Sequence, residues 1–231
     1  MTAEGRTVWP AALLFDLDGT LIDSVADIAA AVNELLALSA LGPLTVPQVR
    51  SIIGRGVETL VERAFFLAGA PLQPNGLKQE FARMQDIYPR HLTGLTTLMP
   101  AAAETLAVLS QDGIALGLAT NKPQRFIEII LDYYGLAHMF GSAIGGDAGV
   151  DKKPAPDMLI AAMDELGVGP RDTVMVGDSS SDVAAARAAG VQVVIVRGGY
   201  TTTPPDRLGA DLVIASLGDL PVALPDLRPP S

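Results

Sequence analysis

The sequence contains no cysteine, only two histidines and few aromatic residues, which make up 5% of its 231 residues. Without cysteine, the chain forms no disulfide, offers no thiolate nucleophile and builds no cysteine-ligated metal site. No apolar run approaches 18 uninterrupted residues, so the sequence predicts no membrane span. The first ten residues include Glu4 and Arg6 and lack a long apolar stretch, which does not fit a signal peptide. We therefore expect a cytoplasmic location.

Positive charge is also scarce. The chain has 16 Lys and Arg against 26 Asp and Glu, which gives a formal net charge of −10 and a sequence pI of about 4.5. Such acidity argues against binding of nucleic acid or of an anionic membrane surface. Hydrophobic residues make up 49%, enough for a sizeable core. We expect a globular protein, a monomer or a homodimer, whose partner is a small molecule.

Hydrophobic periodicity divides most of the chain into alternating strands and helices. Alternation of this kind predicts right-handed crossovers and a doubly wound, Rossmann-like parallel sheet, an α/β fold. The predicted strands cover 8–15, 114–119, 142–144, 173–176, 191–196 and 211–214, and the predicted helices after residue 100 cover 104–111, 123–134, 157–166 and 181–189.

A different pattern occupies the stretch between the first and second strands. Ser24 to Leu41 has the 3.6-residue period of a helix, and Ser24 with Asp27 fits a capping box. Residues 42–95 have further helical patterns interrupted by glycine and proline, and no convincing strand. We expect a small α-helical cap domain, residues 23–95, inserted into a core of residues 1–22 and 96–231, with hinges near 21–23 and 94–100.

Polar residues that could take part in binding or catalysis follow the carboxyl ends of the predicted strands. Ligands bind at this edge of doubly wound sheets, so these side chains should converge there. Four carboxylates without clustered histidine or cysteine offer the hard oxygen ligands that suit Mg²⁺. Hydroxyl, amide and lysine groups could hold a phosphate, which together predicts metal-assisted phosphoryl transfer. The residues are Asp16, Asp18, Thr120, Asn121, Lys153, Asp178 and Asp182.

Two of the acids have the spacing of a nucleophile and its proton-transfer partner. Asp16 could attack a phosphoryl group to form an acyl phosphate, which divides a slow hydrolysis into two steps. Asp18 could then protonate the leaving oxygen and later deprotonate the attacking water.

Four short motifs resemble those of the haloacid dehalogenase superfamily, in its order and spacing: Phe15-Asp16-Leu17-Asp18-Gly19-Thr20-Leu21, Thr120-Asn121, Lys153-Pro154 and Gly177-Asp178-Ser179-Ser180-Ser181-Asp182. The resemblance implies a Rossmann-like core with an inserted helical cap. It implies that Asp16 is the nucleophile and a metal ligand, that Asp18 is the acid/base and ligates through its carbonyl, and that Lys153 neutralises charge. Thr120 and Asn121 would bind the phosphoryl group, and Asp178 and Asp182 would hold Mg²⁺.

Within this superfamily the chain is most similar to the phosphoglycolate phosphatases. The similarity includes Asp23-Ser24, Gly145-Gly146-Asp147 and Gly199-Tyr200. Two departures affect substrate preference: Lys153-Pro154-Ala155-Pro156 lacks the usual histidine, and Gly-Asp-Ser-Ser-Ser-Asp lacks the usual arginine. In the expected cap, Arg55 lies between two glycines; it either belongs to a plain turn or binds a charged group of the substrate.

We therefore expect a Mg²⁺-dependent phosphatase of a small metabolite, with 2-phosphoglycolate as the leading substrate. Related phosphatases of sugar phosphates, nucleotides or pyrophosphate are alternatives, as is a mutase of the β-phosphoglucomutase type, which shares the four motifs. A non-catalytic, receiver-like signalling domain is a third possibility, but the acid pair and the inserted cap argue against it.

Overall fold

The computed structural model describes residues 9–227 and contains a six-stranded, fully parallel sheet in the order β5-β4-β1-β6-β7-β8. Because the chain runs from the central strand β1 first to one side and then to the other, the carboxyl end of β1 lies at the topological switch point. The strands are β1 (Ala12–Phe15), β4 (Ala115–Ala119), β5 (Ser142–Ile144), β6 (Thr173–Gly177), β7 (Gln192–Val196) and β8 (Leu212–Ile214).

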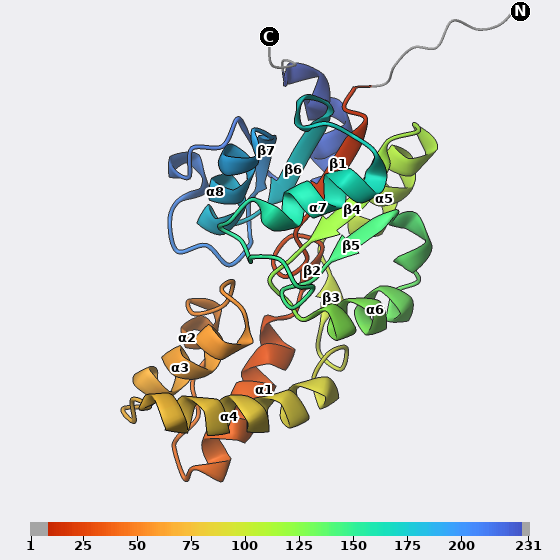
Figure 1. Ribbon diagram of the computed structural model, residues 1–231. Helices are drawn as coiled ribbons and strands as arrows, with labels where there is room; N and C mark the ends of the chain where they lie inside the picture. The colour runs from red at the N-terminus through yellow and green to blue at the C-terminus, as the bar shows by residue number, and fades with distance from the viewer. Residues whose placement is uncertain (1–8, 228–231) are drawn as a thin grey trace, which may run out of the picture.

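Helices cover both faces of this sheet (Figure 1). We call the sheet and these helices the sheet lobe. Alternating side chains of β1 show the division: Leu13 and Phe15 join one apolar cluster with α5 and α6, whereas Leu14 joins another with α7 and α8. The α/β fold expected from the sequence is confirmed. The helices are α5 (Ala102–Gln111), α6 (Gln124–Tyr133), α7 (Asp157–Leu166), α8 (Ser180–Ala189) and the short α9 (Leu220–Ala223).

Four helices form a second body beside the carboxyl edge of the sheet, here called the helical lobe (Figure 1). They are α1 (Val25–Leu38), α2 (Val46–Arg50), α3 (Val57–Leu67) and α4 (Pro74–Ile87), followed by the 3₁₀ turn Tyr88–Arg90. Their apolar faces pack on one another, with Val32, Val61 and Met84 fully buried. Residues 42–95 contain no strand, in agreement with the sequence pattern.

A two-stranded antiparallel ribbon joins the two lobes. β2 (Ile22–Asp23) pairs with β3 (Thr97–Leu98), so the chain enters and leaves the helical lobe through adjacent strands. The sequence analysis placed hinges near these positions but predicted no strands, because two-residue strands carry no periodicity. The Asp27 carboxylate, buried in α1, accepts hydrogen bonds from the amides of Leu95 and Thr96 beside the ribbon.

Two local expectations were wrong. The first strand begins at Ala12 and not at residue 8, since Trp9 to Ala11 form a bend around Pro10; Val8 lies outside the described residues. Ser24 and Asp27 form no capping box: the hydroxyl of Ser24 donates to Asp18, and the Asp27 carboxylate binds the returning chain. The side chains of Ser24 and Asp27 therefore bind residues outside the helix instead of the amides at its start.

Among residues 9–227, no helix combines the length and apolar composition needed to cross a bilayer.

The sheet core provides a test of the packing. Leu14 is fully buried between β4, β6 and α7, so Leu14→Ala should lower the free energy of unfolding by about 2–5 kcal/mol. Phe66→Ala is the control, because Phe66 is 68% exposed and should change stability by no more than about 0.5 kcal/mol. Urea denaturation of both variants checks this; equal losses would contradict the assigned packing.

Candidate active site

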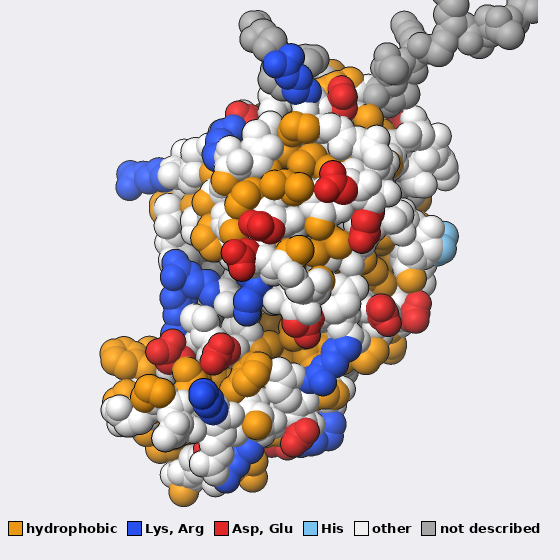
Figure 2. Space-filling model, in the orientation of Figure 1, with side chains coloured by type: hydrophobic (Ala, Val, Ile, Leu, Met, Phe, Trp, Pro, Cys, Tyr) orange, Lys and Arg blue, Asp and Glu red, His pale blue; other side chains and the backbone are white. Residues whose placement is uncertain are grey.

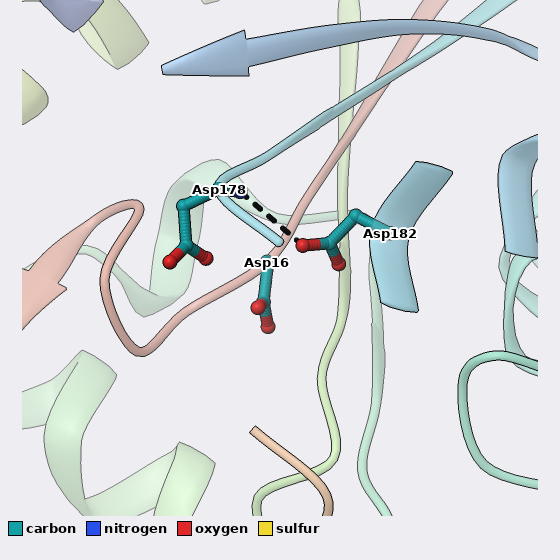
Figure 3. Close-up of side chains that lie close together, drawn as sticks. All are labelled: Asp16, Asp178 and Asp182. Atoms are coloured by element: carbon teal, nitrogen blue, oxygen red, sulfur yellow. Dashed lines mark hydrogen bonds between the residues drawn. The ribbon is translucent and has the colours of Figure 1, made fainter. Parts of the chain in front are cut away.

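Three carboxylates converge at the carboxyl edge of the sheet, as the positions of their strands dictate. Asp16 follows β1, Asp178 follows β6, and Asp182 lies in the first turn of α8. One carboxylate oxygen from each lies within 4.8 Å of the others. In Figure 3 the Asp16 side chain lies between those of Asp178 and Asp182. The structure thus brings together three of the four acids that the sequence analysis assigned to metal binding.

Lys153 is the cation that contacts this cluster. It follows β5 in the chain, its side chain is 2% exposed, and its Nζ lies 3.0 Å from Asp16 Oδ1 and 2.6 Å from Asp182 Oδ1. One ammonium group therefore bridges two carboxylates in a site nearly closed to water, where such contacts are stronger than on the surface.

The second oxygen of Asp182 fixes the turn that carries Asp178. Asp182 Oδ2 accepts hydrogen bonds from the amides of Asp178 and Ser179, at 3.2 and 3.0 Å, and from the Ser179 hydroxyl at 2.7 Å. A carboxylate in the first turn also interacts favourably with the helix dipole of α8. Both oxygens of Asp182 are thus engaged by protein donors, and Asp16, with 13% of its side chain exposed, is the most accessible of the three acids.

Burial and mutual repulsion shift the protonation equilibria of these groups. Burial, helped by the charge of Asp182 and opposed by Lys153, raises the pKa of Asp16 to about 6. Burial and the neighbouring acids Asp182 and Asp16 raise the pKa of Asp178 well above its usual value. Burial alone would lower the pKa of Lys153, but the carboxylates outweigh it and raise that pKa to about 12.

Two glycines permit the close packing of the acids. A Cβ at Gly177 would lie 2.4 Å from Asp182 Cγ, and one at Gly199 would lie 2.2 Å from Asp178 Cβ. Both contacts are too short for any side chain, so glycine is required at these positions for steric reasons.

Asp18 lies outside the three-carboxylate cluster and has different partners. Its carboxylate accepts hydrogen bonds from Lys122 Nζ, at 2.9 and 3.1 Å, and from the Ser24 hydroxyl at 2.6 Å. Lys122 also donates to the Tyr88 hydroxyl of the helical lobe at 2.9 Å. Burial would lower the pKa of Lys122, but the Asp18 carboxylate raises it above its ordinary value.

The sequence analysis missed Lys122, although it directly follows the assigned pair Thr120-Asn121. A buried lysine is rare without a charged partner, and its side chain is only 2% exposed. Nothing in the local pattern separates it from a solvated lysine, because its partners are 34 and 104 residues away.

Thr120 and Asn121 both lie buried beside these acids, at the end of β4. The Asn121 amide group donates to the carbonyl oxygens of Lys153 and of Gly54 in the helical lobe, each at 2.9 Å. Asn121 therefore joins the two lobes here, and its amide hydrogens are already engaged. In this conformation an anion at this position would have to bind donors other than the side-chain amide group of Asn121.

Two clefts between the lobes open onto Asp16 and Asp18. The first has mainly apolar walls from the helical lobe, including Ile28, Val57 and Leu60. The second is lined by Arg55 and Arg63 from the helical lobe together with hydroxyl-bearing residues of the sheet lobe; those residues are Ser179, Ser180, Ser181, Thr201, Thr202 and Thr203. Figure 2 shows Lys and Arg side chains at the narrowing between the lobes. Arg55 is exposed in this cleft and does not belong to the buried cluster.

The donor set fits a divalent cation. Three carboxylates within 4.8 Å, two with raised pKa values, mark a site whose negative charge is incompletely compensated by Lys153. Hard oxygen ligands of this kind match Mg²⁺.

The raised pKa of Asp16 predicts how the metal-free protein responds to pH. Because the folded-state pKa, about 6, exceeds the ordinary value of 3.8, the folded state binds this proton more tightly. Stability from Asp16 is therefore present at low pH and lost as pH rises from about 4 to 6. Between pH 4 and 7 in EDTA, wild type should lose about 2 kcal/mol more than Asp16→Asn.

Urea unfolding at several pH values measures this difference. Exposed Asp112 provides the matched control, and Asp112→Asn should keep the wild-type pH dependence. Parallel stability curves for wild type and Asp16→Asn would contradict the expectation.

Comparisons with known proteins agree with this geometry. Residues 13–196 match the model of the haloacid dehalogenase-like hydrolase family. The chain is 39% identical over 213 residues to the phosphoglycolate phosphatase of Caulobacter vibrioides, covering 92% of this chain and 90% of that protein.

Two solved structures are also similar. One, described as a predicted phosphoglycolate phosphatase from Haemophilus somnus, has a TM-score of 0.87 and 30% identity, covering 94% of this chain and 99% of that one. The other, CbbY from Rhodobacter sphaeroides in complex with phosphate, has a TM-score of 0.80 and 26% identity, with the same coverage. The resemblance expected from the four motifs is confirmed, and the chain belongs to the haloacid dehalogenase-like hydrolase family.

Proposed function

We propose that the chain is a Mg²⁺-dependent phosphatase that hydrolyses a small phosphomonoester through an aspartyl-phosphate on Asp16. The observation that carries this proposal is the Asp16 carboxylate at the switch point of the sheet, beside Lys153 and two further acids. Lys153 reduces the repulsion between Asp16 and an incoming phosphate, which otherwise amounts to roughly 4 kcal/mol per pair of unit charges at 4 Å.

In the first step an Asp16 oxygen attacks phosphorus, and the bond from phosphorus to the ester oxygen breaks. Asp18, two residues further along the chain, gives its proton to the leaving alcohol. In the second step Asp18 takes a proton from water as that water attacks phosphorus, and the bond between phosphorus and Asp16 breaks. Such proton transfers contribute typically about 10² to 10⁴ in rate.

The metal would be held by Asp16 and Asp178, with Asp182 as support and the Asp18 carbonyl as a further ligand. When bound, Mg²⁺ supplies positive charge that stabilises the phosphoryl oxygens. Thr120 and the segment following it contribute donors to the same oxygens, while Lys122 and Ser24 hold Asp18 in place.

We also propose that residues 23–95 form a cap on a core of residues 1–22 and 96–231. The β2–β3 ribbon supports this division, since it joins the lobes through two adjacent strands. Contacts such as Asn121 to the Gly54 carbonyl close the cap over the site. A closed cap excludes bulk water during formation of the aspartyl-phosphate, and opening releases product.

The proposed substrate is 2-phosphoglycolate. Relatives about 40% identical are named phosphoglycolate phosphatase, and the cleft that contains Asp16 and Asp18 also contains Arg55. A guanidinium group matches the geometry of a carboxylate, which 2-phosphoglycolate carries at its other end.

Phosphate release from 2-phosphoglycolate tests the function, with and without Mg²⁺. Asp16→Asn should abolish turnover, because the amide is a poor nucleophile, whereas Asp112→Asn should keep wild-type activity. Normal turnover by Asp16→Asn would refute the covalent mechanism. Conversion of glucose 1-phosphate to glucose 6-phosphate, detected by phosphorus NMR, would contradict the phosphatase proposal and identify a mutase.

The role of Arg55 has a separate test. Arg55→Gln should raise KM for 2-phosphoglycolate about tenfold or more, as expected when a charged hydrogen bond is lost. It should leave KM for 2-hydroxyethyl phosphate, which lacks the carboxylate, nearly unchanged. Exposed Arg207, which lines neither cleft, provides the control variant Arg207→Gln. Equal changes in KM for both substrates would show that Arg55 does not recognise the carboxylate.

A further inference from the structure

Tyr200 contacts both the acid cluster and the start of the helical lobe. It follows β7, is 7% exposed, and its backbone amide donates to Asp178 Oδ2 at 2.5 Å. Its ring lies against Gly19, where a Cβ would be 3.2 Å from the ring carbon Cγ. The proposed mechanism uses none of these contacts.

The hydroxyl of Tyr200 caps helix α1. It accepts hydrogen bonds from the amides of Ser24, at 2.7 Å, and Val25, at 3.0 Å, and it donates to Asp23 Oδ1 at 2.8 Å. The first amides of a helix have no partner within the helix, and the N-cap side chain usually binds only those of the second or third helical residue. Here a residue 176 positions away provides the acceptor.

This arrangement leaves the N-cap side chain available for another contact. Ser24 is the N-cap residue of α1, yet its hydroxyl makes no cap hydrogen bond and donates to Asp18 Oδ1 at 2.6 Å. A serine hydroxyl has one proton and rotates to suit its partner. The Tyr200 hydroxyl binds the Ser24 amide and lies 3.5 Å from the Ser24 hydroxyl, so it fixes the backbone that carries this side chain.

The helical lobe also contacts the loop that carries Tyr200. Arg50, at the end of α2, donates to the carbonyl oxygens of Gly198 and Gly199, at 3.4 and 3.3 Å. Its guanidinium carbon lies 5.1 Å from the centre of the Tyr200 ring, and the group is 3.8 Å from Asp23. The loop therefore lies between Asp178 on one side and two elements of the helical lobe on the other.

We propose that Tyr200 is a positioning residue for Asp18: its hydroxyl binds the backbone amide of Ser24 and so holds the Ser24 hydroxyl in place at Asp18. The same residue fixes Asp178 through its backbone, so the hinge and both acids share one anchor. The inference deepens the proposed function and rests on it for the role of Asp18.

Tyr200→Phe tests the proposal, since it removes only the hydroxyl and keeps the ring and the amide to Asp178. The Ser24 amide loses its acceptor and the Val25 amide keeps only Asp23 Oδ1 at 3.4 Å, so the hydrogen exchange of both amides in the metal-free protein should accelerate about tenfold or more. Turnover of 2-phosphoglycolate should fall about 10- to 100-fold in kcat, with KM nearly unchanged, because Ser24 loses its backbone anchor and no longer holds its hydroxyl at Asp18.

Ser24→Ala separates positioning from packing. It should lower kcat by a similar factor while leaving exchange at Val25 slow, since the Tyr200 cap remains. The double variant should be no slower than Ser24→Ala, because both changes remove the same hydrogen bond. Tyr133→Phe is the control: Tyr133 is 64% exposed, and the variant should match wild type.

Three results would overturn the proposal: unchanged exchange at Ser24 and Val25 in Tyr200→Phe, full kcat in Ser24→Ala, or multiplicative losses in the double variant. A wild-type protein that releases no phosphate from 2-phosphoglycolate or p-nitrophenyl phosphate would refute the proposed function. Hydrogen exchange would then still decide whether Tyr200 caps α1.

Discussion

Repulsion among three carboxylates at one sheet edge is the constraint on which the surrounding structure depends. With Asp16, Asp178 and Asp182 within 4.8 Å of one another, each pair of charges costs roughly 4 kcal/mol in a partly buried site. Lys153 offsets part of this cost by bridging two of the acids, and the start of α8 offsets more through amide donors to Asp182. One ammonium group faces three carboxylates, so compensation is incomplete, and burial adds to the cost by raising the pKa values of Asp16 and Asp178.

This arrangement follows from the parallel sheet, in which the carboxyl ends of neighbouring strands lie side by side. The ends of β1 and β6 are adjacent, so Asp16 and Asp178 become neighbours as soon as the register is set. Gly177 and Gly199 then remove the side chains that would keep the acids apart. The site is therefore a consequence of sheet topology and of two close backbone approaches, and the helices on both faces stabilise the sheet that positions it.

Strand periodicity and the strand-end rule were sufficient to predict the sheet, its crossover helices and the convergence of Asp16, Asp178 and Asp182. They failed where a side chain had both a local and a distant partner available. Ser24 has the sequence of a capping residue, yet its hydroxyl binds Asp18 and its amide binds the Tyr200 hydroxyl. Lys122 resembles any solvated lysine until the fold places it against Asp18, 104 residues away. Such contacts depend on the packing of the two lobes, which leaves no periodic signal.

The net charge of −10 is compatible with a phosphate substrate for the same local reason. At physiological salt the Debye length is about 8 Å, so acids scattered over the surface are screened from the site. Within the cleft the balance differs: Lys153 and Lys122 are buried against the acids, and Arg55 and Arg63 line one wall. Because two lobes contribute these cations, their approach to one another changes the local charge as well as the access of water. The proposed closure of the helical lobe over the sheet edge would therefore couple anion binding to the exclusion of solvent.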